Sequence, residues 1–109
     1  MTEEKETELR RRHPWWNVPC EHRDGWFDLL DRFAASVDAH GGPAPELLQV
    51  KQKFGELRVY LRGDDVVRQL AEEATKASRT TCEECGKPGT LRWGPRVRTR
   101  CPEHLVEDE

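Results

Sequence analysis

The sequence predicts an α+β domain in the order helix, β-hairpin, helix, followed by a C-terminal zinc-ribbon-like β-hairpin. Apolar residues recur every three or four positions over 24–38 and 65–78, which is typical of amphipathic helices. Over 47–62 they alternate with polar residues, as in strands with one wet face. Paired cysteine and histidine residues bracket a short strand-like pattern over 79–105. These periods follow one another along 109 residues, a length that suits one small domain.

The composition leaves little material for a hydrophobic core. Residues of the set AVILMFWYC make up 35% of the chain and charged residues 36%. A typical soluble domain has ~45–50% apolar and ~25% charged residues. Small domains with thin cores are commonly stabilised by metals or disulfides. We therefore expect something besides apolar burial to hold this fold.

The charge balance and the apolar runs narrow the class of partner. Eighteen Lys and Arg residues stand against 21 Asp and Glu residues, for a net charge of −3. A nucleic acid would therefore be bound only through a local basic patch. No apolar run approaches the ~18–20 residues that span a membrane, and the polar start lacks the apolar stretch of a signal peptide. We expect a cytoplasmic protein with no membrane partner, whose four cysteines are thiols or metal ligands.

The chain ends are expected to be polar tails around a small α+β core that spans residues 14–78. Residues 1–13, with glutamates followed by three arginines, predict a flexible N-terminal tail or a frayed helix, and 106–109 an acidic tail. Trp15 and Trp16 are adjacent, so they cannot both point the same way from regular structure. One is expected to cover the core, and the other to be half-exposed or to offer a binding surface.

The first helix is predicted over 24–38. Its apolar stripe consists of Trp26, Leu29, Leu30, Phe33, Ala34 and Val37. Asp24 is a plausible N-cap, and Gly41-Gly42-Pro43 ends the segment. Asp28, Asp31 and Asp38 lie largely off the stripe and are expected on a solvated face, with a paired-carboxylate catalytic role as the alternative. The second helix is predicted over 65–78, capped by Asp64 or Asp65, and the alanines of its narrow apolar face suggest close approach to the hairpin.

The predicted hairpin over 47–62 turns at Gly55 and carries cations on its wet face. That face would hold Lys51, Lys53, Arg58, Tyr60 and Arg62. Cations around an aromatic ring can bind phosphates and stack a base. Alternating charges also keep any half-exposed hairpin soluble, so both interpretations stay open.

The pattern that carries chemistry is C-x2-C followed by C-x2-H. Cys82 and Cys85 form the first pair, and Cys101 and His104 form the second. Zinc prefers four thiolate and imidazole ligands in a tetrahedron, and two ligands three residues apart on a tight turn can converge on one ion. The segment between the pairs is expected to be a hairpin that brings them together. Four protein ligands leave no open coordination position, so we predict a structural zinc ion.

Basic residues gather within this zinc-ribbon-like segment. The candidates for contact with nucleic acid are Arg92, Trp93, Arg96, Arg98 and Arg100. The last three arginines alternate and would share one face of a strand. They could instead stabilise the negative zinc–thiolate centre or pair with acidic residues of the helices. Outside the segment, Cys20 beside His22 is expected to be an ordinary small thiol, with metal ligation a minor option.

Four stretches within about residues 24–104 carry a resemblance to known proteins. They are Gly25-Trp26-Phe27-Asp28-Leu29-Leu30, Lys51-Gln52-Lys53-Phe54-Gly55-Glu56-Leu57-Arg58-Val59-Tyr60, Cys82-Glu83-Glu84-Cys85-Gly86-Lys87-Pro88-Gly89 and Arg98-Thr99-Arg100-Cys101-Pro102-Glu103-His104. Through these stretches the chain resembles a family of small bacterial and phage-encoded proteins of uncharacterised activity. The resemblance implies the same architecture and metal site and adds little about function.

These observations favour a non-enzymatic zinc-binding module that engages nucleic acid or a nucleic-acid-handling protein. The alternative is a small protein-interaction factor, such as a phage-encoded inhibitor, an antitoxin or an immunity-type protein. The sequence has no phosphate-binding loop, no HExxH and no nucleophile elbow, so we expect neither catalysis nor a small-molecule substrate. A metal-dependent hydrolase would need a ligand set with an open position.

Overall fold

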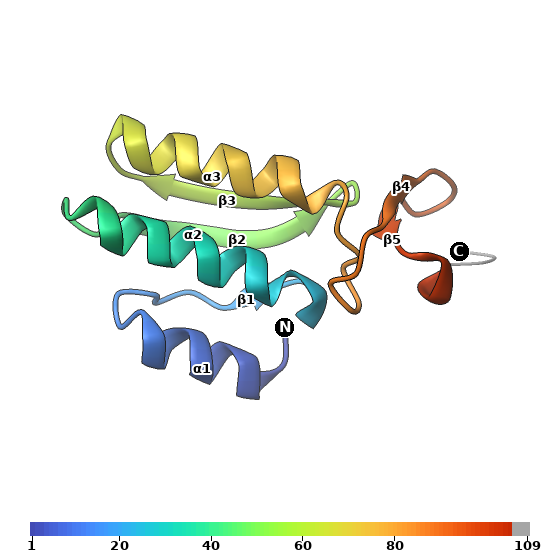
Figure 1. The fold of residues 1–109 in the computed structure, drawn as a ribbon, viewed down its shortest axis with the longest axis horizontal. Coiled ribbons are helices and arrows are strands. Elements are labelled where there is room, and N and C mark those ends of the chain that lie inside the picture. Colours follow the sequence, from blue (N-terminus) through green and yellow to red (C-terminus); the bar gives the residue numbers. More distant parts are fainter. Residues whose placement is uncertain (106–109) are drawn as a thin grey trace.

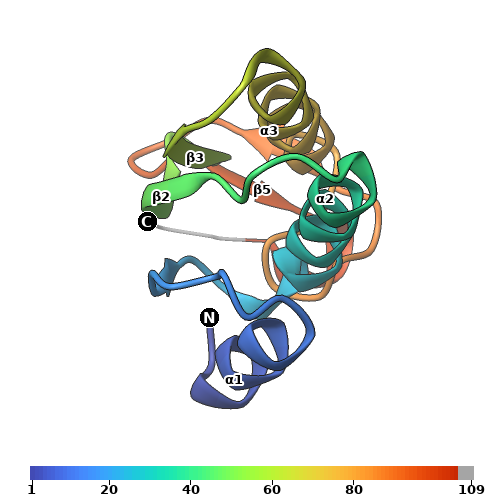
Figure 2. The ribbon, with the colours of Figure 1, turned by 90° about the vertical axis from the view of Figure 1, so that its left-hand side faces the viewer.

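Helices α2 and α3 lie side by side on one face of a three-stranded sheet, and a small two-stranded ribbon stands at one end of this body (Figures 1 and 2). The computed structural model describes residues 1–105. It confirms the predicted α+β class, including a C-terminal β-hairpin. The elements are α1 (Glu3–Arg12), β1 (Cys20–Glu21), the 3-10 turn η1 (Asp24–Trp26), α2 (Phe27–His40), β2 (Glu46–Lys53), β3 (Glu56–Arg62), α3 (Asp65–Ser78), β4 (Thr90–Arg92), β5 (Arg98–Arg100) and the 3-10 turn η2 (Pro102–His104).

The two central helices form where the apolar periodicity predicts them. The expected stripe of α2 is buried, and Gly41 ends the helix in the left-handed conformation, with φ 77°. The Asp64 side chain caps α3 by accepting a 2.9 Å hydrogen bond from the Val67 N–H. Ala71 and Ala74 are buried, and small side chains there let α3 approach the sheet closely. The Ser78 hydroxyl accepts a 2.9 Å bond from the Leu57 N–H of β3.

Asp24 has a different role from the predicted N-cap of the first helix. It begins η1, and the cap position before this turn makes no side-chain hydrogen bond. Its carboxylate instead accepts hydrogen bonds from the backbone N–H and the hydroxyl of Thr2, at 2.7 and 3.1 Å. Asp24 therefore ties the start of α1 to the start of α2.

The sheet has the order β1-β2-β3 and contains a strand that the alternation did not predict. Strands β2 and β3 form the predicted antiparallel hairpin, with Lys53 opposite Glu56 at its turn. Strand β1 pairs in parallel with β2, with Cys20 opposite Val50. Two residues are too few to show a period of two, so β1 had no signal in the sequence. Its pairing covers the middle of the β2 edge, at Val50 and Lys51, and β3 forms the other edge of the sheet.

The N-terminal segment is a helix packed on the body, which corrects the expectation of a flexible tail over 1–13. Leu9 of α1 is fully buried in the common core. His13 is also buried, and its two ring nitrogens lie 2.8 Å from an Asp31 oxygen and 2.6 Å from an Asp38 oxygen. Arg12 pairs with Asp31 at 2.7 Å. Asp31 and Asp38, which were expected on a solvated face of α2, therefore bind the end of α1. They do so because the basic residues there complement their negative charge.

The adjacent tryptophans divide as expected, one into the core and one at its margin. Trp16 is buried and meets the Phe33 ring edge to face. Trp15 is half-buried, and its indole N–H donates a 2.8 Å hydrogen bond to Asp38. Within residues 1–105 no helix combines the length and apolar character needed to cross a membrane.

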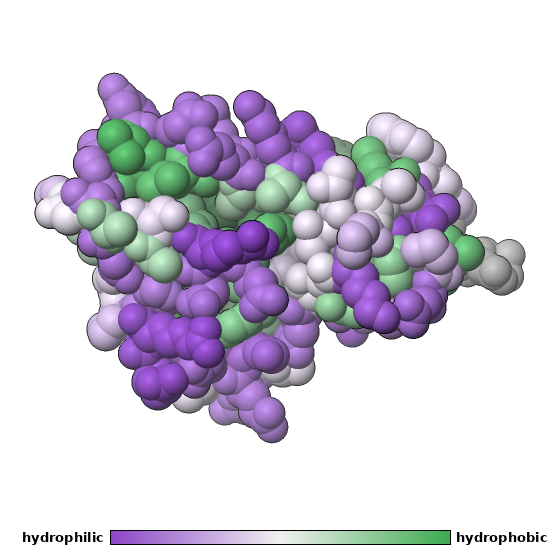
Figure 3. Space-filling view, in the orientation of Figure 1, coloured by the Kyte–Doolittle hydropathy of each residue, from purple (hydrophilic) through white to green (hydrophobic). Residues whose placement is uncertain are grey.

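The ribbon of β4 and β5 packs on the body through the β2–β3 turn. The Thr99 hydroxyl of β5 donates a buried 2.6 Å hydrogen bond to the Gly55 carbonyl. Gly55 has a φ of 81°, and a Cβ atom there would lie 2.5 Å from the Leu91 side chain and 3.2 Å from the Arg98 backbone nitrogen, so the left-handed backbone and the close packing both favour glycine. Arg98 reaches back to Gln52 of β2 at 3.2 Å. The space-filling view shows the ribbon as a smaller lobe beside the body, on a largely hydrophilic face (Figure 3).

Candidate metal centre

The first ligand pair lies on a tight turn between α3 and β4. Cys82 and Cys85 are joined by a loop in which the Gly86 N–H donates a 2.9 Å hydrogen bond to the Cys82 carbonyl. Gly86 has a φ of 82°, a conformation that glycine adopts at little cost. The turn therefore curls both thiols toward the same point.

The second pair lies on η2, directly after β5. Cys101 precedes the turn and Pro102 occupies its first position, where proline's missing N–H is not needed. The His104 N–H donates a 3.0 Å bond to the Cys101 carbonyl, and this closes the turn. Antiparallel pairing of Thr90 with Arg100 brings the end of β5 back beside the first turn.

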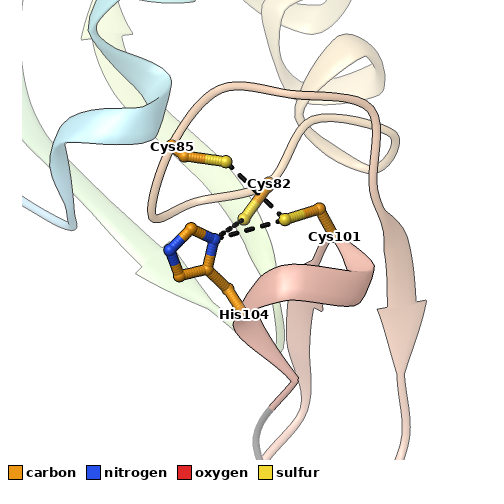
Figure 4. A group of neighbouring side chains, drawn as sticks. All are labelled: Cys82, Cys85, Cys101 and His104. Carbon is orange, nitrogen blue, oxygen red and sulfur yellow. Dashed lines mark hydrogen bonds between the residues drawn. The ribbon is translucent and has the colours of Figure 1, made fainter.

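The four side chains converge on one small volume (Figure 4). Their potential ligand atoms all lie within 4.8 Å of one another. The Sγ atoms of Cys85 and Cys101 are 3.6 Å apart, and His104 Nδ1 lies 3.2 Å from Cys101 Sγ and 3.8 Å from Cys82 Sγ. A tetrahedral zinc ion with ordinary Zn–S and Zn–N bonds would separate its ligands by about 3.6–3.8 Å. The cluster could therefore hold a metal ion, with Nδ1 as the imidazole ligand atom.

The sulfur separations also bear on disulfide formation. All four cysteines of the chain are free thiols. The 3.6 Å between Cys85 and Cys101 far exceeds the ~2.05 Å of a disulfide bond. Thiols held in contact without bonding are the arrangement expected of metal ligands.

The protein surroundings favour a thiolate at Cys82. Burial opposes its ionisation, but backbone N–H groups of Cys101, Cys85 and Glu84 point at the sulfur and lower its pKa to about 7. At Cys85 the Lys87 N–H favours the thiolate, while desolvation and the neighbouring sulfurs of Cys101 and Cys82 outweigh it and raise the pKa. Crowded thiols of this kind repel one another when ionised, and a divalent cation relieves that repulsion.

The first ligand turn is docked directly on the body. The Gly25 N–H donates a 2.7 Å hydrogen bond to the Glu83 carbonyl. The Trp26 indole donates a 2.9 Å bond to the Thr81 carbonyl, and the Arg23 N–H donates a 3.2 Å bond to the Glu83 carboxylate. The residues between the two cysteines therefore belong to the packing interface with η1.

Arg100 lies beneath this turn and is not part of an exposed basic face. Its guanidinium bonds Glu83 at 3.0 Å and Glu84 at 3.4 Å. The Arg100 and Glu83 side chains are only 6% and 5% exposed. Arg100 is thus paired with acidic residues, but these lie in the ligand turn and not on a helix, where the alternative interpretation placed them. Its inclusion among the nucleic-acid candidates is corrected, because phosphate contact would break a buried ion pair.

The other basic candidates of the ribbon lie nearer the surface. Arg98 is half-buried and bonds Gln52, and Arg96 precedes β5 on the connection from β4. Arg92 is half-buried, with its Nε lacking a hydrogen-bond partner among residues 1–105. Trp93 on the same connection is 80% exposed. The structure thus brings these four residues together on one short hairpin.

The candidates on the sheet gather on the face opposite the helices. Val50 and Leu57 are fully buried toward α2 and α3, so the alternate positions face the other way. This open face carries Lys51, Lys53, Arg58, Tyr60 and Arg62. Arg58 lies 2.8 Å from Glu56, and Arg62 lies 3.7 Å from Glu46. The cations of this face that ion pairs constrain least are Lys51 and Lys53. The face as a whole is polar, as the alternation predicts.

Sequence reasoning missed Phe54. It lies at the β2–β3 turn, 66% exposed, and has a φ of 53°. The signal was available: a two-residue hairpin loop normally begins with Asn or Asp before Gly, and here a phenylalanine precedes Gly55.

Cys20 and His22 do not join the metal cluster. Cys20 is buried on β1, where desolvation raises its pKa to about 12. His22 is buried against Trp26, with ring centroids 5.5 Å apart, and its Nδ1 lies 2.7 Å from the Arg23 carbonyl. Cys20 is thus an ordinary small thiol, as expected, and both residues are buried side chains.

Searches of protein-family models, of curated proteins and of solved structures found no match to this chain.

Proposed function

We propose that this chain is a non-enzymatic module in which Cys82, Cys85, Cys101 and His104 bind a structural zinc ion. Three sulfurs and one imidazole are the donor set that zinc prefers, and their separations suit a tetrahedron. Such an ion would join the two ends of the ribbon and supply stability that the thin core lacks. Four protein ligands leave it no open position for a substrate, which supports a structural role.

We further propose that the module engages nucleic acid, or a protein that handles nucleic acid, through the ribbon and the open face of the sheet. The observation that carries this proposal is local charge. Segment 90–100 contains four arginines and no carboxylate, although the whole chain has a net charge of −3. Three of these arginines stand outside the buried Arg100 pair, beside the exposed Trp93. Phosphate binding requires a local positive surface of this kind.

The test is binding of labelled single- and double-stranded DNA and RNA at roughly 50 and 200 mM salt. We expect salt-dependent affinity that weakens in the double variant K51Q/K53Q. R11Q, which removes an exposed cation from α1, serves as the control and should bind like the wild type. Lack of any salt-dependent binding by the wild type would refute the nucleic-acid function.

A second candidate function, a small protein-interaction factor, is favoured by a groove between β3 and α3. The groove has a volume of about 520 Å³ and is lined by Val59, Leu61, Ala71 and Thr75 among others. The Leu57 N–H points away from β2 and donates to Ser78. Because the direction of the backbone groups alternates along a strand, every second residue of β3 directs its N–H and carbonyl groups toward the open edge of the sheet. An extended peptide could add there as a strand. This would be the surface of an inhibitor, antitoxin or immunity-type protein.

The variant T75R tests this alternative by placing a long cation in the groove. Affinity capture from host extract should retain a specific protein on the wild type and lose it on T75R. Equal capture by both would remove the groove from consideration.

A further inference from the structure

The β2–β3 turn places a bulky ring where the backbone disfavours it. Phe54 and Gly55 have φ values of 53° and 81°, and Lys53 pairs with Glu56 around them. Two positive φ angles in a two-residue loop match a type I′ turn, for which Asn-Gly is the favoured sequence. A bulky residue is an outlier in this region. The turn would therefore form more easily with Asn than with Phe54.

Core packing does not explain this residue. The Phe54 side chain is 66% exposed, and the core cluster does not include it. Its recorded ring contact is with the Lys53 ammonium, 5.8 Å from the ring centroid. Strained residues that contribute little to stability are commonly found at binding sites.

A second exposed ring lies at the same end of the molecule. Trp93 is 80% exposed on the β4–β5 connection. The two turns are in contact, since Gly55 abuts the side chain of Leu91 and receives the Thr99 hydroxyl bond. Trp93 follows Leu91 by only two residues, a rise of about 7 Å. Figure 1 shows the β2–β3 turn beside the ribbon that carries this connection.

Cations lie on or next to the two turns that carry the rings, and the Glu56 carboxylate at the β2–β3 turn is engaged. Lys53, Arg92 and Arg98 flank the two turns. Glu56 at the turn is paired with Arg58 at 2.8 Å and with Arg79 at 2.6 Å. Exposed aromatic rings within a positive field match the chemistry of unpaired bases linked by phosphates.

We propose that Phe54 and Trp93 form a stacking platform for single-stranded nucleic acid. This inference rests on the proposed nucleic-acid function and narrows it to one ligand class and two residues. A flat ring that projects from a turn can stack only on a base whose face is free. Bases in a duplex offer no free face, because they stack on one another. The flanking cations would hold the phosphates on either side of the stacked bases.

The experiment measures anisotropy of labelled single-stranded oligonucleotides and of the matched duplex, using the full chain loaded with zinc. F54N installs the favoured turn sequence, so its melting temperature should equal or exceed that of the wild type. We expect single-strand binding at least roughly fivefold weaker in F54N and in W93A. W93F, which keeps a ring, should bind nearly like the wild type. V66N is the matched control, because Val66 is 46% exposed at the far end of α3.

The outcomes separate the two levels of the proposal. Wild-type affinity in F54N and W93A, or equal affinity of the wild type for duplex and single strand, would overturn the platform and leave general nucleic-acid binding intact. No binding by the wild type would overturn both. Selective loss of single-strand binding in F54N at undiminished thermal stability supports the platform, since a merely structural residue would not behave in this way.

Discussion

Gly25 and Glu83 touch through their backbones, with a 2.7 Å hydrogen bond from the Gly25 N–H to the Glu83 carbonyl. This contact joins the turn before α2 to the residues between two metal ligands. A Cβ atom on Gly25 would lie 2.2 Å from the Cys82 carbonyl oxygen and 2.4 Å from that of Glu83. The body and the metal-binding turn can therefore approach this closely only at a glycine.

Replacing Gly25 with alanine should separate these two parts. Backbone atoms cannot move aside as a flexible side chain can, so we expect G25A to lose about 1–3 kcal/mol of stability. Thermal denaturation followed by circular dichroism measures the loss. G94A is the control, because its Cβ would meet nothing nearer than 4.0 Å. Equal melting temperatures for G25A and G94A would contradict the close contact.

Removing one member of the buried Glu83–Arg100 pair should be costly. E83A leaves the Arg100 guanidinium, 6% exposed, facing Glu84 alone at 3.4 Å. Breaking a buried ion pair typically costs about 3–5 kcal/mol. Chemical denaturation of E83A tests this expectation. The exposed Lys87–Glu103 pair lies in the same module, and E103A should change stability very little.

Loss of the metal ligands should unfold at least the C-terminal third of the chain. C82S and C101S each remove one donor from the four-residue cluster, and a strong chelator removes the ion itself. We expect elemental analysis to find one zinc per wild-type chain and a lower melting temperature after chelation. C20S should keep its zinc, since Cys20 lies on β1 outside the cluster. Unchanged folding of a verified zinc-free sample would show that the ion does not stabilise the fold.

The variant L9A tests whether α1 belongs to the folded body. Leu9 is fully buried, and truncating such a leucine costs about 2–5 kcal/mol. We expect a clear drop in melting temperature for L9A and none for R10A on the exposed side of the same helix. A melting curve of L9A that matches the curve of the wild type would show that residues 1–13 are a tail and not part of the folded body.

His22 should make the protein less stable as the pH falls. Burial lowers its pKa from the ordinary value of 6.5, although the Arg23 carbonyl and the carboxylates of Glu83 and Asp24 oppose this shift. The unfolded chain therefore binds a proton first, and stability decreases as the pH falls through 6.5 toward the folded pKa. Above pH 6.5 this loss is absent.

The variant H22N isolates this contribution from other groups that titrate in the same range. Its amide can still donate to the Arg23 carbonyl, as Nδ1 does, but it does not titrate. Melting temperatures between about pH 5 and 8 should fall more steeply for the wild type than for H22N. Parallel curves would assign the pH dependence to groups other than His22.

The elements with long periodic patterns were predictable from the sequence, and the short contacts between them were not. The stripe of α2, the alternation of β2 and β3 and the ligand spacing each repeat often enough to define an element. Helix α1 buries Leu9 alone among its residues, so no stripe marked its packing. Its docking depends on Arg12 and His13 meeting carboxylates about twenty residues away.

The metal cluster was predictable for a different reason. Two ligands three residues apart on a turn converge on one point whatever the rest of the fold does. Cys82 therefore predicts Cys85 as a second ligand, and Cys101 predicts His104. The burial of Arg100 was not predictable, because alternation shows which residues share a face and not whether that face is buried. Its partners, Glu83 and Glu84, come from a turn that only the tertiary fold brings beneath β5.

The two edges of the sheet differ, and this limits how copies of the chain could join. Strand β1 has two residues and lies beside α1, while β3 has seven and is the open edge. Pairing of β3 with β3 of a second copy would use the long edge strand of each. The opposite edge offers the two residues of β1 and the ends of β2 on either side of them, so it is a much less regular template for a further strand.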